Sequence, residues 1–302
     1  MAPRVAVVAP SSPFPADEFE RGLAWLRGRA EVSVDPRCLD RLGYLAGADD
    51  ARAGAVLAAL RDPEVRCLWA ARGGYGAMRL LERHGAAMLD ALRADPKPLV
   101  GFSDATALHA LWARAGVPSV HGAMVSGLHR TDTARGETWA TVAGEAIEPW
   151  EGLEAVCNGG RVEGVARGGN LALVAALAGT PWGLDLRGAV LFLEDVNEPP
   201  YRVDRMLTTL RLAGALDGVA AVVLGDFTGG GEGPDGATAD LTLWERLQSL
   251  DVPVLAGAPF GHGKRQRPWV SGGRVAVDPA RGAVTFEPLA PPFAFPYGTR
   301  AT

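Results

Sequence analysis

Residues 98–115 read PLVGFSDATALHALWARA, in which a short apolar run, a tight turn and a helix-like stretch follow one another. The run Pro98–Gly101 predicts a buried strand, and Asp104–Ala115 predicts a helix. The same succession recurs along the chain, because short apolar runs that end in Gly or Pro alternate with helix-like stretches. This alternation is typical of βα units around a largely parallel sheet, so the sequence predicts an α/β fold.

Outward from this stretch, the pattern predicts further elements in both halves of the chain. In the first half we expect strands at 4–9, 31–34, 65–71 and 117–120, and helices at 16–28, 49–60 and from residue 77. Residues 130–165 show no sustained period, so we place the domain boundary near 145–160, with domains at residues 1–150 and 151–302. In the second half we expect helices at 170–178, 201–213 and 241–250, strands at 189–193, 219–224 and 252–256, and a hairpin over 273–288.

The composition argues against several classes of protein. The 302 residues carry a net charge of −5 and no basic stripe, which disfavours a nucleic-acid partner because phosphate contacts need Lys and Arg. No run approaches the roughly 18 apolar residues of a membrane span, and the run Val5–Ala9 is too short for a signal peptide. The three cysteines are far apart, as in a reducing compartment, so we expect a cytoplasmic protein.

The motifs predict neither a cofactor nor a metal. The loop 72–76, RGGYG, follows a predicted strand, but Arg79 stands where a dinucleotide fingerprint needs Gly or Ala, and no GxxxxGK[ST] motif occurs. HExxH, paired cysteines and closely spaced histidines are also missing. The same loop can instead present backbone N–H groups to a substrate oxygen.

The turn in the opening stretch is the strongest candidate for chemistry. Residues 101–105 read G-x-S-x-A, one methyl group away from the nucleophile-elbow pattern G-x-S-x-G. Ser103 would stand on a sharp bend with its hydroxyl exposed, and the free amide of Asp104 at the helix start would face a developing oxyanion. A serine before an apolar helix is also an ordinary helix N-cap. The local sequence leaves both interpretations open.

A serine nucleophile needs a base, and the chain has five histidines. His262 is flanked by glycines, which let the backbone approach another segment closely and aim the imidazole. His121 ends a predicted strand and is a candidate to line the pocket. Glu194 directly follows a predicted strand and so lies at the edge where open α/β sheets collect catalytic groups, while Asp195 should point the other way. A loop histidine and a strand-end acid are also common surface features.

Several stretches together closely resemble the LD-carboxypeptidase family of serine peptidases, in order and over nearly the whole chain. In the first half they are 43–47 (GYLAG), 71–76 (ARGGYG), 79–81 (RLL), 96–98 (PKP), 101–108 (GFSDATAL) and 121–122 (HG). In the second half they are 168–171 (GGNL), 192–196 (FLEDV), 200–207 (PYRVDRML) and 259–263 (PFGHG). The resemblance implies an N-terminal domain with a largely parallel sheet flanked by helices, joined to a smaller mixed α/β C-terminal domain.

The resemblance further implies a catalytic triad of Ser103, His262 and Glu194, divided between the two domains. His262 would take the Ser103 proton and return it to the leaving amine, and Glu194 would hold the imidazole in the required tautomer. The amides of Asp104 and of a glycine in the 72–76 loop, assigned to Gly74, would form the oxyanion hole.

Members of this family cleave the amide between an L-centre and a D-amino acid, usually releasing D-Ala from the murein tetrapeptide, so we expect a small peptide substrate. The candidate substrate contacts are Arg72, Gly73, Tyr75, His121 and Arg202, and Arg265 is a further candidate for the substrate carboxylate. Relatives hydrolyse microcin C-type peptide–nucleotide antibiotics, for which Tyr75, Trp182 and Trp269 are candidates to stack a base. The family often dimerises, so a homodimer is one expectation. A binding protein without catalysis is disfavoured, because all three triad residues are present.

Overall fold

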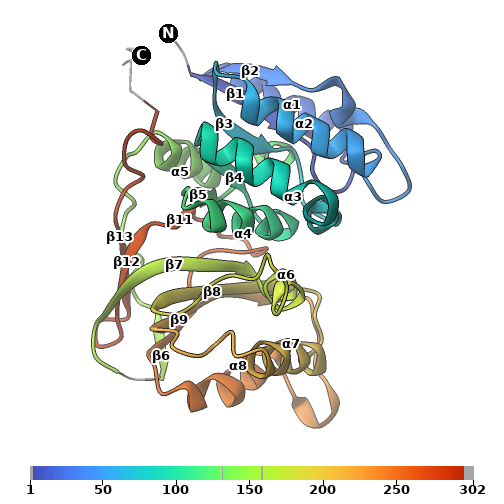
Figure 1. Cartoon of the computed structure of the whole chain (residues 1–302). Helices are drawn as coiled ribbons and strands as arrows, with labels where there is room; N and C mark the ends of the chain where they lie inside the picture. Colours follow the sequence, from blue (N-terminus) through green and yellow to red (C-terminus); the bar gives the residue numbers. More distant parts are fainter. Residues whose placement is uncertain (1–2, 131, 158, 296–302) are drawn as a thin grey trace. The chain divides into compact units, whose positions relative to one another are not determined.

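The computed structural model describes residues 3–130, 132–157 and 159–295, and these residues form two compact units (Figure 1). Unit 1 holds residues 3–146, 268–270 and 288–295, and unit 2 holds residues 147–267 and 271–287. The chain therefore re-enters unit 1 after its first exit, whereas the domains predicted from the sequence meet at a single boundary.

Unit 1 is built on a six-stranded sheet with the order β11-β5-β4-β3-β1-β2. Its strands are β1 (Arg4–Val8), β2 (Glu31–Val34), β3 (Val65–Ala70), β4 (Leu99–Gly101), β5 (Ser119–His121) and β11 (Trp269–Ser271). Strands β1 to β5 pair in parallel. The strand order reverses between β1 and β3, so the loops after these two strands flank a topological switch point, where open α/β sheets bind ligands.

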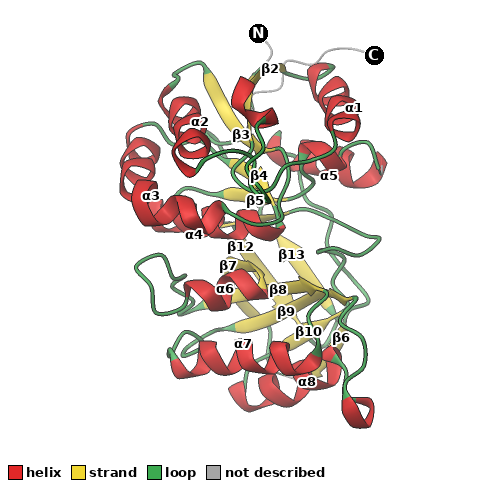
Figure 2. Cartoon of the chain, turned by 90° about the vertical axis from the view of Figure 1, so that its right-hand side faces the viewer, coloured by secondary structure: helices red, strands yellow, loops and turns green. Residues whose placement is uncertain are grey.

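Helices cover both faces of this sheet. They are α1 (Ala16–Arg27), α2 (Asp49–Arg61), α3 (Ala77–Ala94), α4 (Thr106–Ala115) and α5 (Asp132–Val142). Helices α2, α3 and α4 lie on one face, and α1 and α5 lie on the other (Figure 2). Sheet residues such as Leu68, Trp69 and Val100 are consequently 0% exposed. Covered faces explain why these strands read as continuous apolar runs rather than as alternating ones.

Unit 2 contains a mixed seven-stranded sheet with the order β13-β12-β7-β8-β9-β10-β6. Its strands are β6 (Glu154–Cys157), β7 (Val162–Asn170), β8 (Ala189–Val196), β9 (Ala221–Thr228), β10 (Val254–Ala256), β12 (Arg274–Asp278) and β13 (Ala283–Phe286). Strands β7 to β10 are parallel, and β6, β12 and β13 join antiparallel. The carboxyl ends of the four parallel strands therefore share one edge of the sheet.

The helices of unit 2, α6 (Leu171–Leu177), α7 (Pro200–Leu212) and α8 (Ala239–Leu247), pack on one face of that sheet. Leu193 of β8 and Leu224 of β9 lie in the core that they cover. Because side chains alternate along a strand, Phe192 faces the other way, where it joins a cluster of aromatic rings.

The α/β fold class and the predicted hairpin, observed as β12 and β13, are confirmed. The sequence did not predict α5, β6, β7 or β11. Five short 3₁₀ helices complete the described elements: η1 (Pro36–Leu39), η2 (Ser103–Ala105), η3 (Val125–Gly127), η4 (Pro234–Gly236) and η5 (Gln248–Leu250). None of the helices in the described part of the chain has both the length and the apolar character of a membrane span.

Candidate active site

Ser103 forms the tip of the bend between β4 and α4, at the C-terminal edge of the unit 1 sheet. Its φ angle is +60°, in the left-handed region, where a residue with a side chain is strained by about 1–2 kcal/mol. A helix N-cap has extended backbone, so this angle separates the two interpretations that the sequence leaves open. A strained backbone at this turn is what the predicted nucleophile elbow requires.

Packing behind the bend supports this conformation. The Nε2–H group of His109 donates to the Gly101 carbonyl at 2.9 Å, and Ser119 Oγ lies 2.7 Å from Nδ1 of the same ring. The N–H of Gly122 donates to the same carbonyl at 3.1 Å. Burial lowers the pKa of His109 to about 4, so the ring is neutral near pH 7 and acts as a fixed structural donor.

The loop after β3 passes beside the Ser103 hydroxyl. A Cβ atom added to Gly73 would lie 3.2 Å from Ser103 Oγ, so the Gly73 backbone adjoins that oxygen. The Gly73 carbonyl accepts from the N–H of Ser12, which follows β1, at 3.2 Å. In a trans peptide the next N–H, that of Gly74, points away from this contact. Gly74 has a φ of +102°, and an added Cβ would lie 2.5 Å from Ser12 Oγ, so this position requires glycine.

The buried side chains of Asp104 and Arg52 hold the same loop in place. The sequence analysis did not predict a role for either side chain. Asp104 is 1% exposed, and its Oδ2 accepts from the N–H of Ala77 at 2.8 Å. Arg52 is 2% exposed and donates to the carbonyl of Gly76 at 3.0 Å and to that of Pro10. Burial raises the pKa of Asp104 against the opposing effect of its hydrogen bonds. No local pattern shows these contacts, because they join residues far apart in the sequence.

In unit 2, Glu194 of β8 is fully buried, and its Oε2 lies 2.6 Å from Nδ1 of His262. Because this bond holds the proton on Nδ1, the neutral imidazole carries its lone pair on Nε2, the nitrogen that can accept a proton. Asp195 turns to the opposite side of the strand, as predicted, and accepts from the Asn170 side chain at 2.8 Å and from the N–H of Ala172 at 2.9 Å.

The surroundings of His262 favour the protonated imidazole. Burial lowers the pKa of this ring, but the hydrogen bond to Glu194 and the negative charges of Glu194, Asp195 and Asp226 outweigh that effect. The pKa of His262 therefore lies above its usual value. This is the arrangement expected of a base that must become cationic during a reaction.

The turn that carries His262 is anchored by the two residues that precede the histidine. Phe260 is 0% exposed and packs with its ring centroid 5.6 Å from that of Phe192 and 5.7 Å from that of Trp150. Gly261 has a φ of +116°, and a Cβ atom added there would lie 2.9 Å from Glu194 Cβ. Glycine at this position therefore allows the turn to approach the carboxylate closely, as the sequence suggests.

The candidate substrate contacts lie in different settings. In unit 1, Arg72 is exposed and donates to the Pro13 carbonyl. Tyr75 is 49% exposed, with its ring centroid 5.6 Å from that of Tyr44. His121 is fully buried beneath the bend and stacks on Trp269, with ring centroids 5.0 Å apart. Both of these stacked rings lie in the core, away from solvent.

In unit 2, Arg202 is exposed at the start of α7 and pairs with Glu198 at 3.6 Å. Arg265 is exposed, and its guanidinium lies 3.4 Å from the Gly257 carbonyl. Trp182 is half-buried. These contacts do not select which arginine would bind a substrate carboxylate.

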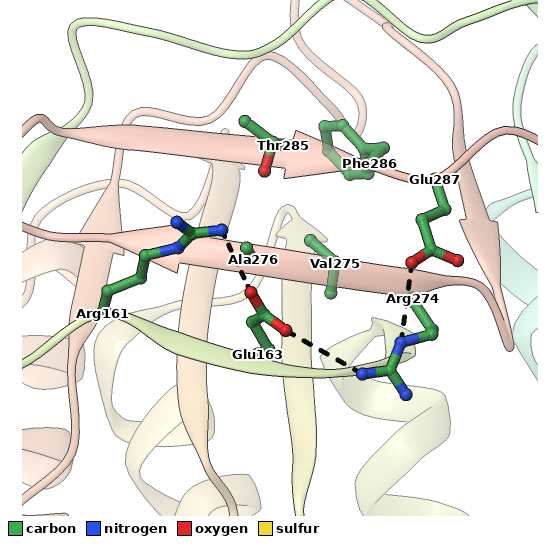
Figure 3. Close-up of a pocket in the computed structure, with 8 residues that line it drawn as sticks. All are labelled: Arg161, Glu163, Arg274, Val275, Ala276, Thr285, Phe286 and Glu287. Carbon is green, nitrogen blue, oxygen red and sulfur yellow. Dashed lines mark hydrogen bonds and ion pairs between the residues drawn. The ribbon is translucent and has the colours of Figure 1, made fainter.

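A separate hollow of about 230 Å³ lies over β7, β12 and β13, and its charges neutralise one another (Figure 3). Glu163 lies 3.0 Å from Arg161 and 3.9 Å from Arg274, which in turn lies 3.6 Å from Glu287. Each charged side chain of this hollow thus has a partner of opposite charge, so the hollow has no net charge that would attract an ionic ligand. In the ranges that the structure describes, no three His, Cys, Asp or Glu side chains gather as a metal site would require.

A two-unit α/β chain with a strained serine and a carboxylate-bound histidine has the parts of a hydrolase. The chain belongs to the LD-carboxypeptidase family: the N-terminal domain of that family matches residues 5–122, and the C-terminal domain matches residues 163–277. It is 42% identical to a putative carboxypeptidase of Streptomyces coelicolor over 86% of this chain and 85% of the relative. It is 33% identical to the murein tetrapeptide carboxypeptidase of Pseudomonas aeruginosa over 89% of this chain and 91% of the relative. The chain is therefore a hydrolase of the peptidase class.

Solved structures agree with this assignment. The muramoyltetrapeptide carboxypeptidase from Oxalobacter formigenes superposes with a TM-score of 0.81 at 30% sequence identity, over 94% of this chain and 97% of the other. The microcin C7 self-immunity protein MccF, in complex with glutamyl sulfamoyl guanosine, has a TM-score of 0.83 at 21% identity, over 95% and 96% of the two chains. At that identity the second likeness concerns the fold alone.

Proposed function

We propose that this protein is a serine LD-carboxypeptidase that releases terminal D-Ala from the murein tetrapeptide. The left-handed backbone of Ser103 carries the proposal, because a strained serine at the C-terminal edge of a parallel sheet is the geometry of a nucleophile. The Glu194–His262 hydrogen bond of 2.6 Å adds an oriented base. Relatives whose names include murein and muramoyl tetrapeptides support the substrate class.

In the proposed reaction, Ser103 Oγ attacks the carbonyl carbon of the scissile amide while Nε2 of His262 takes the hydroxyl proton. The C–N bond then breaks, and His262 gives that proton to the nitrogen of the departing D-Ala. The acyl group remains as an ester on Ser103. A water molecule attacks this ester and passes a proton to His262. The bond to Ser103 Oγ then breaks, His262 returns the proton to that oxygen, and the shortened peptide leaves as a carboxylic acid. Glu194 keeps the imidazole in the correct tautomer and stabilises its cationic form.

The negative oxygen of each tetrahedral intermediate needs donors that are already in place. We assign this role to the amides of Asp104 and Gly74. The assignment of Gly74 rests on the Ser12–Gly73 hydrogen bond, which fixes the orientation of the 73–74 peptide. Loss of one such donor typically costs about 3 kcal/mol in the barrier.

The function is tested with a Ser103→Ala variant incubated with murein tetrapeptide, with D-Ala and tripeptide followed by mass spectrometry. We expect D-Ala release to fall by at least about 10⁴-fold, because the nucleophile is gone. Circular dichroism should match that of the wild type. Ser33→Ala, which changes an exposed serine of β2, is the matched control and should retain full activity. An active Ser103→Ala variant would refute the peptidase mechanism, and a wild-type protein that releases no D-Ala would refute the substrate.

An amidase acting on peptide–nucleotide antibiotics is the second candidate. The exposed ring of Tyr75 next to Gly74 favours it, because a planar base can stack there with Tyr44 as neighbour. Turnover of the tetrapeptide and of an aminoacyl-nucleotide analogue should be compared in the wild type and in Tyr75→Ala. Faster turnover of the nucleotide analogue, lost in the variant, would select this function. A homodimer and a cytoplasmic location stay predictions.

A further inference from the structure

A β-bulge on β9 lies opposite the strand segment that carries Glu194. Leu193 pairs with Leu224, but Asp195 pairs with Phe227. Between these two pairs, β9 therefore contains one residue more than β8. Bulges of this kind bend a strand and re-aim a side chain, and they are frequent beside active sites. The residue that follows Gly225 within this bulge is Asp226.

Asp226 bonds to both ends of the turn that holds His262. Its backbone N–H donates to the Phe260 carbonyl at 2.9 Å, and its Oδ2 accepts from the N–H of Gly263 at 3.1 Å. A Cβ atom added to Gly263 would lie 2.2 Å from that same oxygen, so the turn approaches the carboxylate as closely as glycine allows. Asp226 therefore contacts the chain both before His262, at Phe260, and after it, at Gly263.

The charges around the ring come from three elements. Glu194 and Asp195 lie on β8, Asp226 lies on β9, and Arg265 lies in the loop beyond His262. Burial raises the pKa of Asp226, while the Gly263 N–H and Arg265 oppose that rise. Asp226 is partly exposed at the bulge, in contrast to the fully buried Glu194.

We propose that Asp226 is a second positioning carboxylate for His262, which holds the turn through Gly263 and adds negative charge beside the imidazole. The inference rests on the proposed function, in which His262 is the base that becomes cationic. Glu194 fixes the tautomer through Nδ1, whereas Asp226 fixes the backbone that carries the ring. The observed hydrogen bonds of Asp226 go to the backbone of this turn, so the residue acts through His262.

Two variants separate the two effects. Asp226→Asn removes the charge but keeps an oxygen that can accept from Gly263, and Asp226→Ala removes both. We expect Asp226→Asn to lower the pKa of His262, read from its ring signals in an NMR titration, by about one unit, with kcat near the wild-type value at high pH. Asp226→Ala should show the same pKa shift and lose about tenfold in kcat with little change in KM. Asp240→Asn, a carboxylate of α8 that is absent from the charges acting on His262, is the control.

An unchanged pKa of His262 in Asp226→Asn would overturn the electrostatic role. Wild-type kcat in Asp226→Ala would overturn the positioning role. If Asp226→Ala does not fold, the Asp226→Asn titration still decides the electrostatic role, and an Asp226→Glu variant, with its displaced carboxylate, decides positioning: tenfold lower kcat supports the role and wild-type kcat refutes it. The titration needs no turnover, so a protein that fails to release D-Ala would refute the proposed function without deciding this inference.

Discussion

At the scale of single residues, the contact between Glu194 and His262 makes the clearest prediction about chemistry. Glu194→Gln removes the negative charge that holds the pKa of His262 above its usual value, so that pKa should fall. The base must be neutral to accept a proton, and the acid limb of the pH profile of kcat/KM should therefore move to lower pH. The plateau should drop by about 10³- to 10⁴-fold, because an amide does not enforce the tautomer.

The measurement is the pH–rate profile of D-Ala release, with Glu245→Gln on α8 as a control that should leave the profile unchanged. An acid limb that stays in place, or moves to higher pH, would contradict the assignment of His262 as the base.

Gly261 offers a second prediction, because a neighbouring glycine provides a matched control. Alanine at Gly261 would be strained at a φ of +116° and would also place Cβ 2.9 Å from Glu194 Cβ. Gly257 has a φ of +80°, but a Cβ there meets nothing within 4 Å. Both alanine variants should lose roughly 1 kcal/mol or more of stability, measured by urea unfolding. Only Gly261→Ala should also lose kcat, and equal activity in the two variants would show that the close approach is unimportant.

The sequence could single out candidate site residues only where the signal is local. Ser103, Glu194 and His262 each have small or acidic neighbours in the sequence, and their roles stay proposals that the geometry supports. Asp226 and Arg52 carry no such signal. Asp226 acts because a bulge in β9 brings it to a turn 37 residues away, and Arg52 acts on carbonyls of loops elsewhere in the chain. Contacts of this kind depend on tertiary structure alone.

At the scale of elements, β8 and α6 are joined by Asp195, which accepts from Asn170 and Ala172 at the start of the helix. Burial raises the pKa of Asp195 to about 6, above its value in the unfolded chain. A raised folded pKa gives stability that is complete below the unfolded pKa and is lost as the pH rises through the folded pKa. The stability of the wild type relative to Asp195→Asn should therefore be largest below about pH 4 and decline up to about pH 6.

Chemical denaturation at a series of pH values measures this difference, and Asp185→Asn serves as a control on an exposed loop. If the stability of the wild type relative to Asp195→Asn instead increases between pH 4 and 6, the folded protein stabilises the charged form of the carboxylate, which would contradict the prediction.

Strand β7 is the element that is hardest to predict from the sequence. It contains Gly164, Gly168 and Gly169, which lower the local preference for a strand. A Cβ atom added to Gly168 would lie 2.0 Å from the Phe192 carbonyl of β8, so glycine is there because two backbones come close. Periodicity predicts the strands and helices that bury one apolar face. It cannot detect a strand such as β7, whose glycines are required because the backbone of the neighbouring strand lies so close. The βα succession from β1 to β5 could be predicted because these strands and the helices α1 to α4 between them each carry their own pattern.

At the scale of the whole molecule, the proposed triad takes Ser103 from unit 1 and His262 from unit 2. If the two residues act in one reaction, their loss should not be additive, since a residue without its partner contributes little. Ser103→Ala and His262→Ala should each lower kcat by about 10⁴- to 10⁶-fold, and the double variant should be no slower than the slower single one. Long incubations with tetrapeptide, followed by mass spectrometry, give all three rates. Circular dichroism of the variants excludes unfolding as the common cause. A double variant whose loss is the product of the two single losses would mean that the serine and the histidine act independently, and the triad would have to be abandoned even if the protein hydrolyses the peptide.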